Sequence, residues 1–145
     1  MALSDKITMK FASAQPIGGW EDFLKHGEGF LRTASGAYKK QKKVFTSEIL
    51  YNIIAMAIEK FVMAALMRHG ALPYNHTMKD LVEAMDETFP AAIDDLREGL
   101  LKMDQYQEIC DLDGFRITPP EMKEIQGMLE MAQKLQGMVT EERNA

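Results

Sequence analysis

The chain has 145 residues, a single cysteine and a formal net charge of −5, with a pI near 5.2. This length suits one domain with one sizeable core, and a lone cysteine cannot form an internal disulfide. The acidic balance argues against a general nucleic-acid binder, because such domains usually carry net positive charge. Asp5 and Lys6 interrupt the apolar run that a secretory signal needs, so we expect a cytoplasmic protein.

The charges are unevenly distributed along the chain. Residues 20–43 carry six basic and three acidic side chains, a balance of +3. Residues 78–113 carry three basic and eleven acidic side chains, a balance of −8. We therefore expect the folded domain to have one basic edge and one acidic edge.

The first segments predict an arm and then a helix. Residues 1–19 show little periodicity and end in Gln-Pro-Ile-Gly-Gly, which is typical of an N-terminal arm. From Trp20 to Gln41, apolar residues recur at three- and four-residue spacing, which predicts the first helix. Several glycines lower its helix propensity, so the sequence allows a break near His26 to Gly29.

The segment Ser47–Gly70 predicts one helix of about 23 residues that is apolar around almost its whole circumference. It would span roughly 35 Å, enough to cross a bilayer. However, Asn52, Glu59, Lys60 and Arg68 would be costly in lipid without partners. We therefore interpret it as a core helix, capped by Thr46 or Ser47, and expect no membrane contact.

Three further helices are predicted. A short third helix, capped by Asn75 or Thr77, ends by Phe89. A fourth helix begins at Pro90 and carries an apolar stripe of Ile93, Leu96, Leu100, Met103 and Cys110. The capping box Thr118–Glu121 begins a fifth helix, which frays into a charged tail at 140–145. Together these elements predict an all-α protein, an antiparallel bundle of four to five helices over residues 20–139.

Residues 51–81 resemble the central part of a HEPN domain. The alanine-rich segment from Tyr51 to Gly70 contains Glu59-Lys60, ends at glycine, and is followed by a proline turn and His76-Thr-Met-Lys-Asp-Leu81. By helix order the resemblance covers roughly residues 20–138. It implies a HEPN-like helical bundle that forms a homodimer and that often accompanies a minimal nucleotidyltransferase. Many members of the family are metal-independent ribonucleases.

The ribonuclease members of this family place an arginine four to six residues before a histidine, near the end of the fourth helix. In this chain Arg97 and Arg116 have no histidine in that range, and the corresponding region, 105–116, contains several carboxylates. Carboxylates there would repel a phosphodiester instead of stabilising its developing charge. We therefore assign no catalytic residue and favour a protein that is not an enzyme.

Three groups of residues are candidate sites. A basic group could contact a polyanion, or could only stabilise the carbonyl end of the first helix: Arg32, Tyr38, Lys39, Lys40, Lys42 and Lys43. A polar stripe of Glu48, Asn52 and Glu59 could line a pocket, or form a solvated edge or a dimer contact. His69, His76 and Cys110 could bind a metal but lack a zinc-type spacing, so we expect no metal and no cofactor.

Three functional hypotheses follow. The leading one is a non-catalytic HEPN-like module that forms a homodimer and binds a protein partner or a nucleotide-containing ligand, with a regulatory role. The first alternative is a diverged RNA-processing or RNA-binding protein, although the acidic balance does not favour nucleic acid. The second is a metal- or cofactor-binding helical bundle. The twelve methionines suit either an irregular core or protein contacts.

Overall fold

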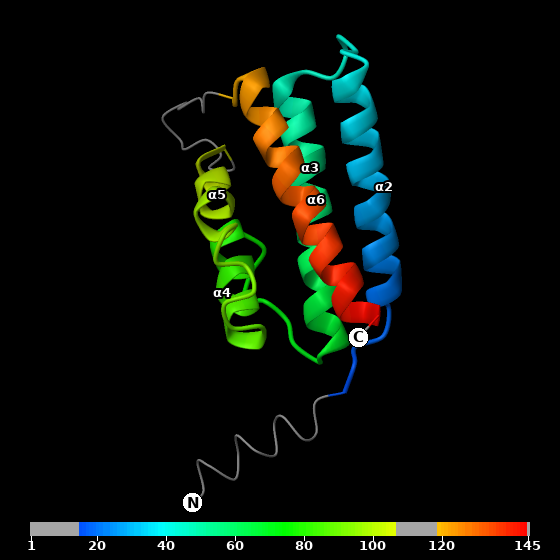
Figure 1. The fold of residues 1–145 in the computed structure, drawn as a ribbon, viewed down its shortest axis with the longest axis vertical. Coiled ribbons are helices and arrows are strands. Elements are labelled where there is room, and N and C mark those ends of the chain that lie inside the picture. Colours follow the sequence, from blue (N-terminus) through cyan, green and yellow to red (C-terminus); the bar gives the residue numbers. More distant parts are fainter. Residues whose placement is uncertain (1–14, 107–118, 145) are drawn as a thin grey trace, which may run out of the picture.

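The computed structural model describes residues 15–106 and 119–144, and these contain five α-helices and no strand. The elements are α2 (Trp20–Lys39), α3 (Ser47–Arg68), α4 (Met78–Thr88), α5 (Arg97–Lys102), the short 3-10 helix η1 (Met103–Tyr106) and α6 (Met122–Asn144). Helices α2, α3 and α6 lie side by side, and α4 and α5 cover the opposite side of α3 and α6 from α2 (Figure 1). The predicted all-α bundle is confirmed.

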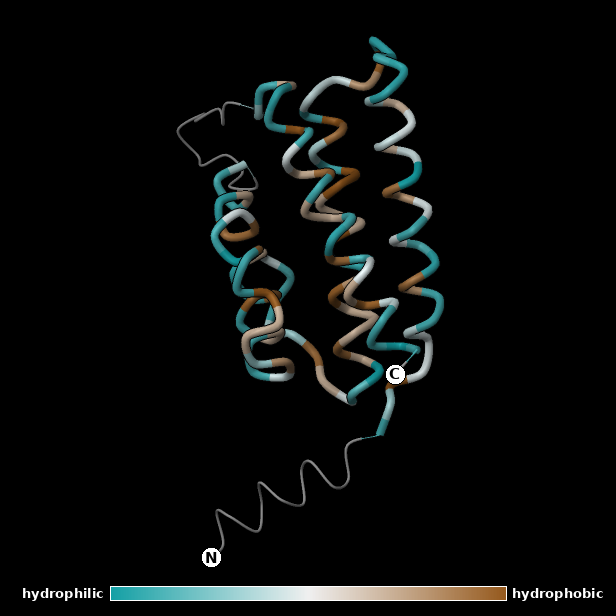
Figure 2. Tube along the Cα trace, viewed as in Figure 1, coloured by the Kyte–Doolittle hydropathy of each residue, from teal (hydrophilic) through white to brown (hydrophobic). Residues whose placement is uncertain are grey.

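Helix α3 is the core of the bundle. Thirteen of its 22 residues are buried, and they point toward α2, α4 and α6 alike, so no single apolar face exists. By length and composition α3 could cross a membrane, but 67% of its most apolar 18-residue window is buried inside the protein. Figure 2 shows the other helices with their hydrophobic residues on the side that faces this core. This is the pattern of a core helix.

The two ends of α3 are closed by local hydrogen bonds. The Thr46 side chain accepts a hydrogen bond of 3.2 Å from the Ile49 N–H, which identifies Thr46 as the N-cap. At the other end, Gly70 has a φ of 73°, and the N–H groups of Gly70 and Ala71 donate back to carbonyls of the last turn. This is a Schellman motif, for which glycine is the favoured residue.

The prediction that the bundle is antiparallel was wrong for three of the helices. Helix α2 runs antiparallel to α3 and α6, whereas α3, α4 and α6 all run in the same direction (Figure 1). Segment 69–77 makes this arrangement possible because it returns along α3, which places His76 Nδ1 3.7 Å from Glu59 Oε2. Helix α4 therefore begins beside the middle of α3 and descends again toward its C-terminal end.

The first turn of α4 is capped by two side chains. The Thr77 hydroxyl accepts a hydrogen bond of 3.1 Å from the Asp80 N–H. The Asp104 carboxylate in η1 accepts hydrogen bonds from the N–H groups of Met78 at 2.8 Å and Lys79 at 3.0 Å. Thr77, and not Asn75, is therefore the N-cap of α4. The cap is completed by Asp104, which lies 26 positions beyond Met78.

Two predicted helix boundaries were wrong. The fourth helix does not begin at Pro90, because residues 90–96 form turns in which Ala91 has a φ of 67°, outside the range of a right-handed helix. Its stripe residue Cys110 and the cap Thr118 lie outside the described residues. The last helix begins at Met122 and continues to Asn144 instead of fraying at Thr140.

Helix α2 continues without a break through its glycines, and Gly27 has a packing role. A Cβ atom at Gly27 would lie 2.8 Å from ring carbons of the fully buried Phe61 and 3.2 Å from the Ala57 carbonyl oxygen of α3. The missing side chain therefore lets α2 approach α3 closely. Gly29, in the next part of the same helix, has no such neighbour within 4 Å.

We expect Gly27→Ala to destabilise the protein by about 1 to 3 kcal/mol, because the added methyl group overpacks the contact with Phe61. The control Gly29→Ala should stabilise it by about 0.5 to 1 kcal/mol, since alanine is the better helix former. Urea unfolding followed by circular dichroism measures both. Equal effects of the two substitutions would show that α2 and α3 are not in close contact at Gly27.

Candidate functional site

A hollow of about 490 Å³ opens where the end of α2, the turn after it and the first turns of α3 and α6 meet. Its rim carries the ammonium groups of Lys39, Lys42 and Lys43, with the half-buried ring of Tyr38 beside them. Its floor is formed by apolar side chains from three elements: Phe45, Leu50 and Met122. The hollow therefore combines a cationic rim with a hydrocarbon floor.

The turn that carries the lysines is held by the backbone. Lys42 N–H donates to the Ala37 carbonyl at 3.2 Å, and Phe45 N–H donates to the Lys42 carbonyl at 3.0 Å. Gln41 adopts a φ of 50°, in the left-handed region, which reverses the chain after α2. The rim is thus formed before any ligand binds, which reduces the ordering cost of binding.

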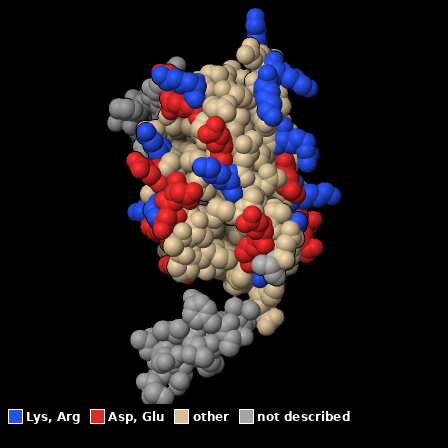
Figure 3. Space-filling model, in the orientation of Figure 1, with Lys and Arg blue, Asp and Glu red and all other residues tan. Residues whose placement is uncertain are grey.

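The three rim lysines have no counterion in the part of the chain that the structure describes. Within residues 15–106 and 119–144, none of their ammonium groups forms an ion pair or a hydrogen bond. Figure 3 shows lysine and arginine side chains gathered along α2 and at the end where α2 meets α3, and acidic side chains over the α4–α5 side. The predicted basic and acidic edges are therefore present in the folded protein.

The other members of the predicted sites lie elsewhere. Arg32 and Lys40 are exposed on α2 and its end but do not line the hollow. In the polar stripe, Glu48 and Asn52 are exposed and Glu59 faces His76, and none of the three lines the hollow. No three His, Cys, Asp or Glu side chains in the described part of the chain are placed to hold a metal ion.

Arg97, considered above for a ribonuclease motif, has a structural role. Its Nη2 lies 2.8 Å from Asp94 Oδ1, and its Nε donates to Asp86 Oδ2 at 3.1 Å. The hydrogen bonds that Arg97 donates to Asp86 and Asp94 raise its already high pKa further. Arg97 therefore ties α4 to the start of α5.

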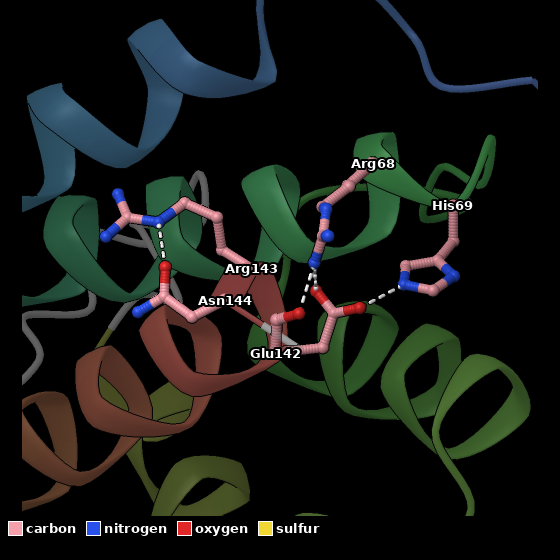
Figure 4. Close-up of polar contacts among 5 residues, drawn as sticks. All are labelled: Arg68, His69, Glu142, Arg143 and Asn144. Atoms are coloured by element: carbon pink, nitrogen blue, oxygen red, sulfur yellow. Dashed lines mark hydrogen bonds and ion pairs between the residues drawn. The ribbon is translucent and has the colours of Figure 1, made fainter.

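The opposite end of the bundle carries a cluster of charges that sequence reasoning missed. Figure 4 shows the Glu142 side chain between Arg68 and His69, with Arg68 Nη1 2.7 Å from Glu142 Oε2. His69 Nε2 contacts the other carboxylate oxygen, and its ring packs edge-to-face on Phe89. Because Glu142 falls in the segment predicted to fray, no periodicity in the sequence indicated this contact.

The cluster lowers the pKa of Glu142. Burial of the carboxylate by itself raises its pKa, but the hydrogen bonds from His69 and Arg68 outweigh that effect, and the net shift is downward. The ionised form is thus the one that holds the last turn of α6 against the end of α3. This contact closes the end of the bundle that lies farthest from the hollow.

A second hollow of about 310 Å³ lies between the α5–η1 segment and α6. Across it the Tyr106 hydroxyl donates to the Glu124 carboxylate. Burial and this hydrogen bond raise the pKa of Tyr106, and the same bond lowers the pKa of Glu124. The pair fastens η1 to the first turn of α6.

Comparisons with protein-family models, curated proteins and solved structures find no match for this chain. The resemblance to HEPN domains therefore stays a prediction from the sequence. What the structure adds is the placement of three predicted lysines around one hollow.

We expect Glu142→Gln to lower the free energy of unfolding by about 1 kcal/mol at pH 7, because it removes a partly buried ion pair. The folded-state pKa is depressed, so this contribution is complete above the unfolded value of about 4.3 and is lost as the pH falls below it. Urea unfolding between pH 7 and pH 3 should show the two proteins converging at the acid end.

The matched control is Glu141→Gln, on the same turn but exposed, which should stay within about 0.5 kcal/mol of the unmodified protein. If both substitutions have the same effect at pH 7, the Arg68–Glu142–His69 cluster does not stabilise the fold.

Proposed function

We propose that this chain is a non-catalytic HEPN-like helical module that forms a homodimer and binds a nucleotide-containing ligand or a protein partner at the hollow between α2, α3 and α6. One observation carries the proposal: Lys39, Lys42 and Lys43 surround this hollow without an acidic partner among residues 15–106 and 119–144. Three uncompensated cations around a concave surface attract an anion, and they act as point charges that suit phosphate or carboxylate.

The lining of the hollow supports binding more than chemistry. Among the described residues its lining includes no histidine, cysteine or carboxylate, so the usual pairs of nucleophile and base are missing from that lining. Tyr38 and Phe45 offer aromatic surface on which a base or an apolar group can pack. A regulatory module that recognises a ligand and presents it to a partner needs no more than this.

The proposed dimer contact is an exposed face of α3 that is separate from the hollow. Ile49 and Met56 are 42% and 44% exposed, although most of α3 is buried, and Asn52 lies between them on the same side of the helix. Large apolar side chains in this position are typical of a protein contact. A two-fold axis through this face would bring α3 of one subunit against α3 of the other.

The anion site is tested with the triple variant Lys39→Gln, Lys42→Gln, Lys43→Gln. Isothermal titration calorimetry with ATP and with hexaglutamate should show at least one ligand losing about tenfold or more in affinity. The control Lys25→Gln, Lys79→Gln, Lys134→Gln changes the net charge equally at exposed lysines outside the hollow. Binding that is absent, or that falls equally in both variants, would contradict the proposal.

The dimer is tested by light scattering during size-exclusion chromatography. The unmodified chain should elute with twice the 16.4 kDa mass of one copy, and Met56→Lys should shift it to the monomer because a charge enters an apolar contact. Leu101→Lys, at a similarly exposed apolar position on α5, should leave the dimer intact. A monomeric unmodified chain would exclude the dimer.

A further inference from the structure

The apolar floor of the hollow restricts the chemical class of its ligand more than the lysine rim does. Phe45, Leu50 and Met122 present only hydrocarbon, ring and thioether surface, and the side-chain hydroxyl and amide groups of the lining belong to Tyr38, Gln41 and Thr46, whose oxygen already accepts a hydrogen bond from the Ile49 N–H. A ligand group seated on this floor finds no hydrogen-bond partner there. A ribose or the edge of a base would lose its water without compensation, whereas an apolar side chain would gain from burial.

The size of the hollow and the exposure of its edge also favour an apolar anchor. A volume of about 490 Å³ is enough for one large side chain and the backbone on either side of it. Met122 is 45% exposed although it is a large apolar residue in the lining of the hollow. Covering Met122 and seating a ring on Phe45 would remove apolar surface from water at the same time.

The rim lysines then define what flanks the anchor. Lys39 stands on the last turn of α2, while Lys42 and Lys43 lie beyond it in the turn, so the three ammonium groups approach the hollow from different positions along the rim. Carboxylates on both sides of an apolar side chain can reach them together. Long-range attraction between such charges speeds association, and the anchor slows dissociation.

From these observations we propose that the hollow binds a segment of a protein partner that carries one large apolar side chain, best an aromatic one, between acidic residues. This inference rests on the proposed function, because it uses the same lysines, and it selects a protein partner over a nucleotide. Within residues 15–106 and 119–144, the acidic edge of a second copy does not fit this description. Its apolar side chains next to Asp94 and Asp95, Ile93 and Leu96, are themselves buried at 1% and 3% exposure.

The test uses three synthetic peptides that differ in one feature each: Asp-Glu-Phe-Asp-Glu, Asp-Glu-Ala-Asp-Glu and Gln-Gln-Phe-Gln-Gln, all with blocked ends. Amide NMR shifts of the full chain report both affinity and position. We expect the first peptide to bind about tenfold more tightly than either of the others. The largest shifts should fall on Thr46, Leu50 and Met122.

Two substitutions measure how much the apolar floor contributes to peptide affinity, separately from the rim lysines. Met122→Gln removes apolar surface at an exposed position and should weaken the phenylalanine peptide about threefold, while leaving the alanine peptide unchanged. Val44→Gln is the control, because Val44 is 74% exposed in the same turn but does not line the hollow. The fold of each variant is checked by the dispersion of its amide spectrum.

The outcomes distinguish this inference from the proposed function. Equal binding of the phenylalanine and alanine peptides, with loss in the Lys39, Lys42, Lys43 variant, would overturn the apolar anchor and leave the anion site in place. Tighter binding of ATP than of the phenylalanine peptide, again lost in that variant, would assign the hollow to a nucleotide instead. Peptide binding that is unchanged in the Lys39, Lys42, Lys43 variant would overturn both the apolar-anchor inference and the proposed anion site.

Discussion

Burial of α3 is the constraint on which the structure depends. A helix that is apolar on almost every side cannot lie on a surface, so it needs partners around most of its circumference. Helix α2 meets this need by approaching through Gly27, α6 by lying alongside in the same direction, and α4 by packing on the remaining side. The part of α3 that these helices leave uncovered is one narrow edge that includes Asn52 and Met56. The shape of the domain, and the place where a second copy can bind, both follow from this requirement.

The two ends of the bundle are chemically opposite, and this results from the chain path. Segment 69–77 returns along α3, so the ends of α3 and α6 meet at one pole, where Glu142 closes the contact with Arg68 and His69. At the other pole the chain turns directly from α2 into α3, and Glu48 in the first turn of α3 does not pair with the rim lysines, nor does any other carboxylate of residues 15–106 and 119–144. One pole therefore has its charges paired within the fold, and the other leaves them available to a ligand.

Sequence periodicity predicted the long elements well, because burial of α3 and amphipathicity of α2 are properties of local sequence. Thr46 and Gly70 were identifiable as helix ends for the same reason. The positive φ of Ala91 was not predictable, because it arises where Ile93 and Leu96 must both be buried in a short turn. The lysines were predicted as a group, but the hollow was not, since its floor needs Met122 from a helix 79 residues beyond Lys43. Contacts of that kind depend on tertiary packing, which periodicity does not encode.

The competing explanation for the lysines is stabilisation of the carbonyl end of α2, and the geometry limits it. A helix dipole acts on charges within about the last turn, and Lys39 alone among the three rim lysines stands there. The carbonyls at this end are also already occupied: those of Gly36, Ala37 and Tyr38 accept hydrogen bonds from backbone N–H groups of residues 40–42. Lys42 and Lys43 therefore add little to the helix. Their common position beside an apolar hollow, with no counterion in the described part of the fold, is explained better by an anion that comes from outside the chain.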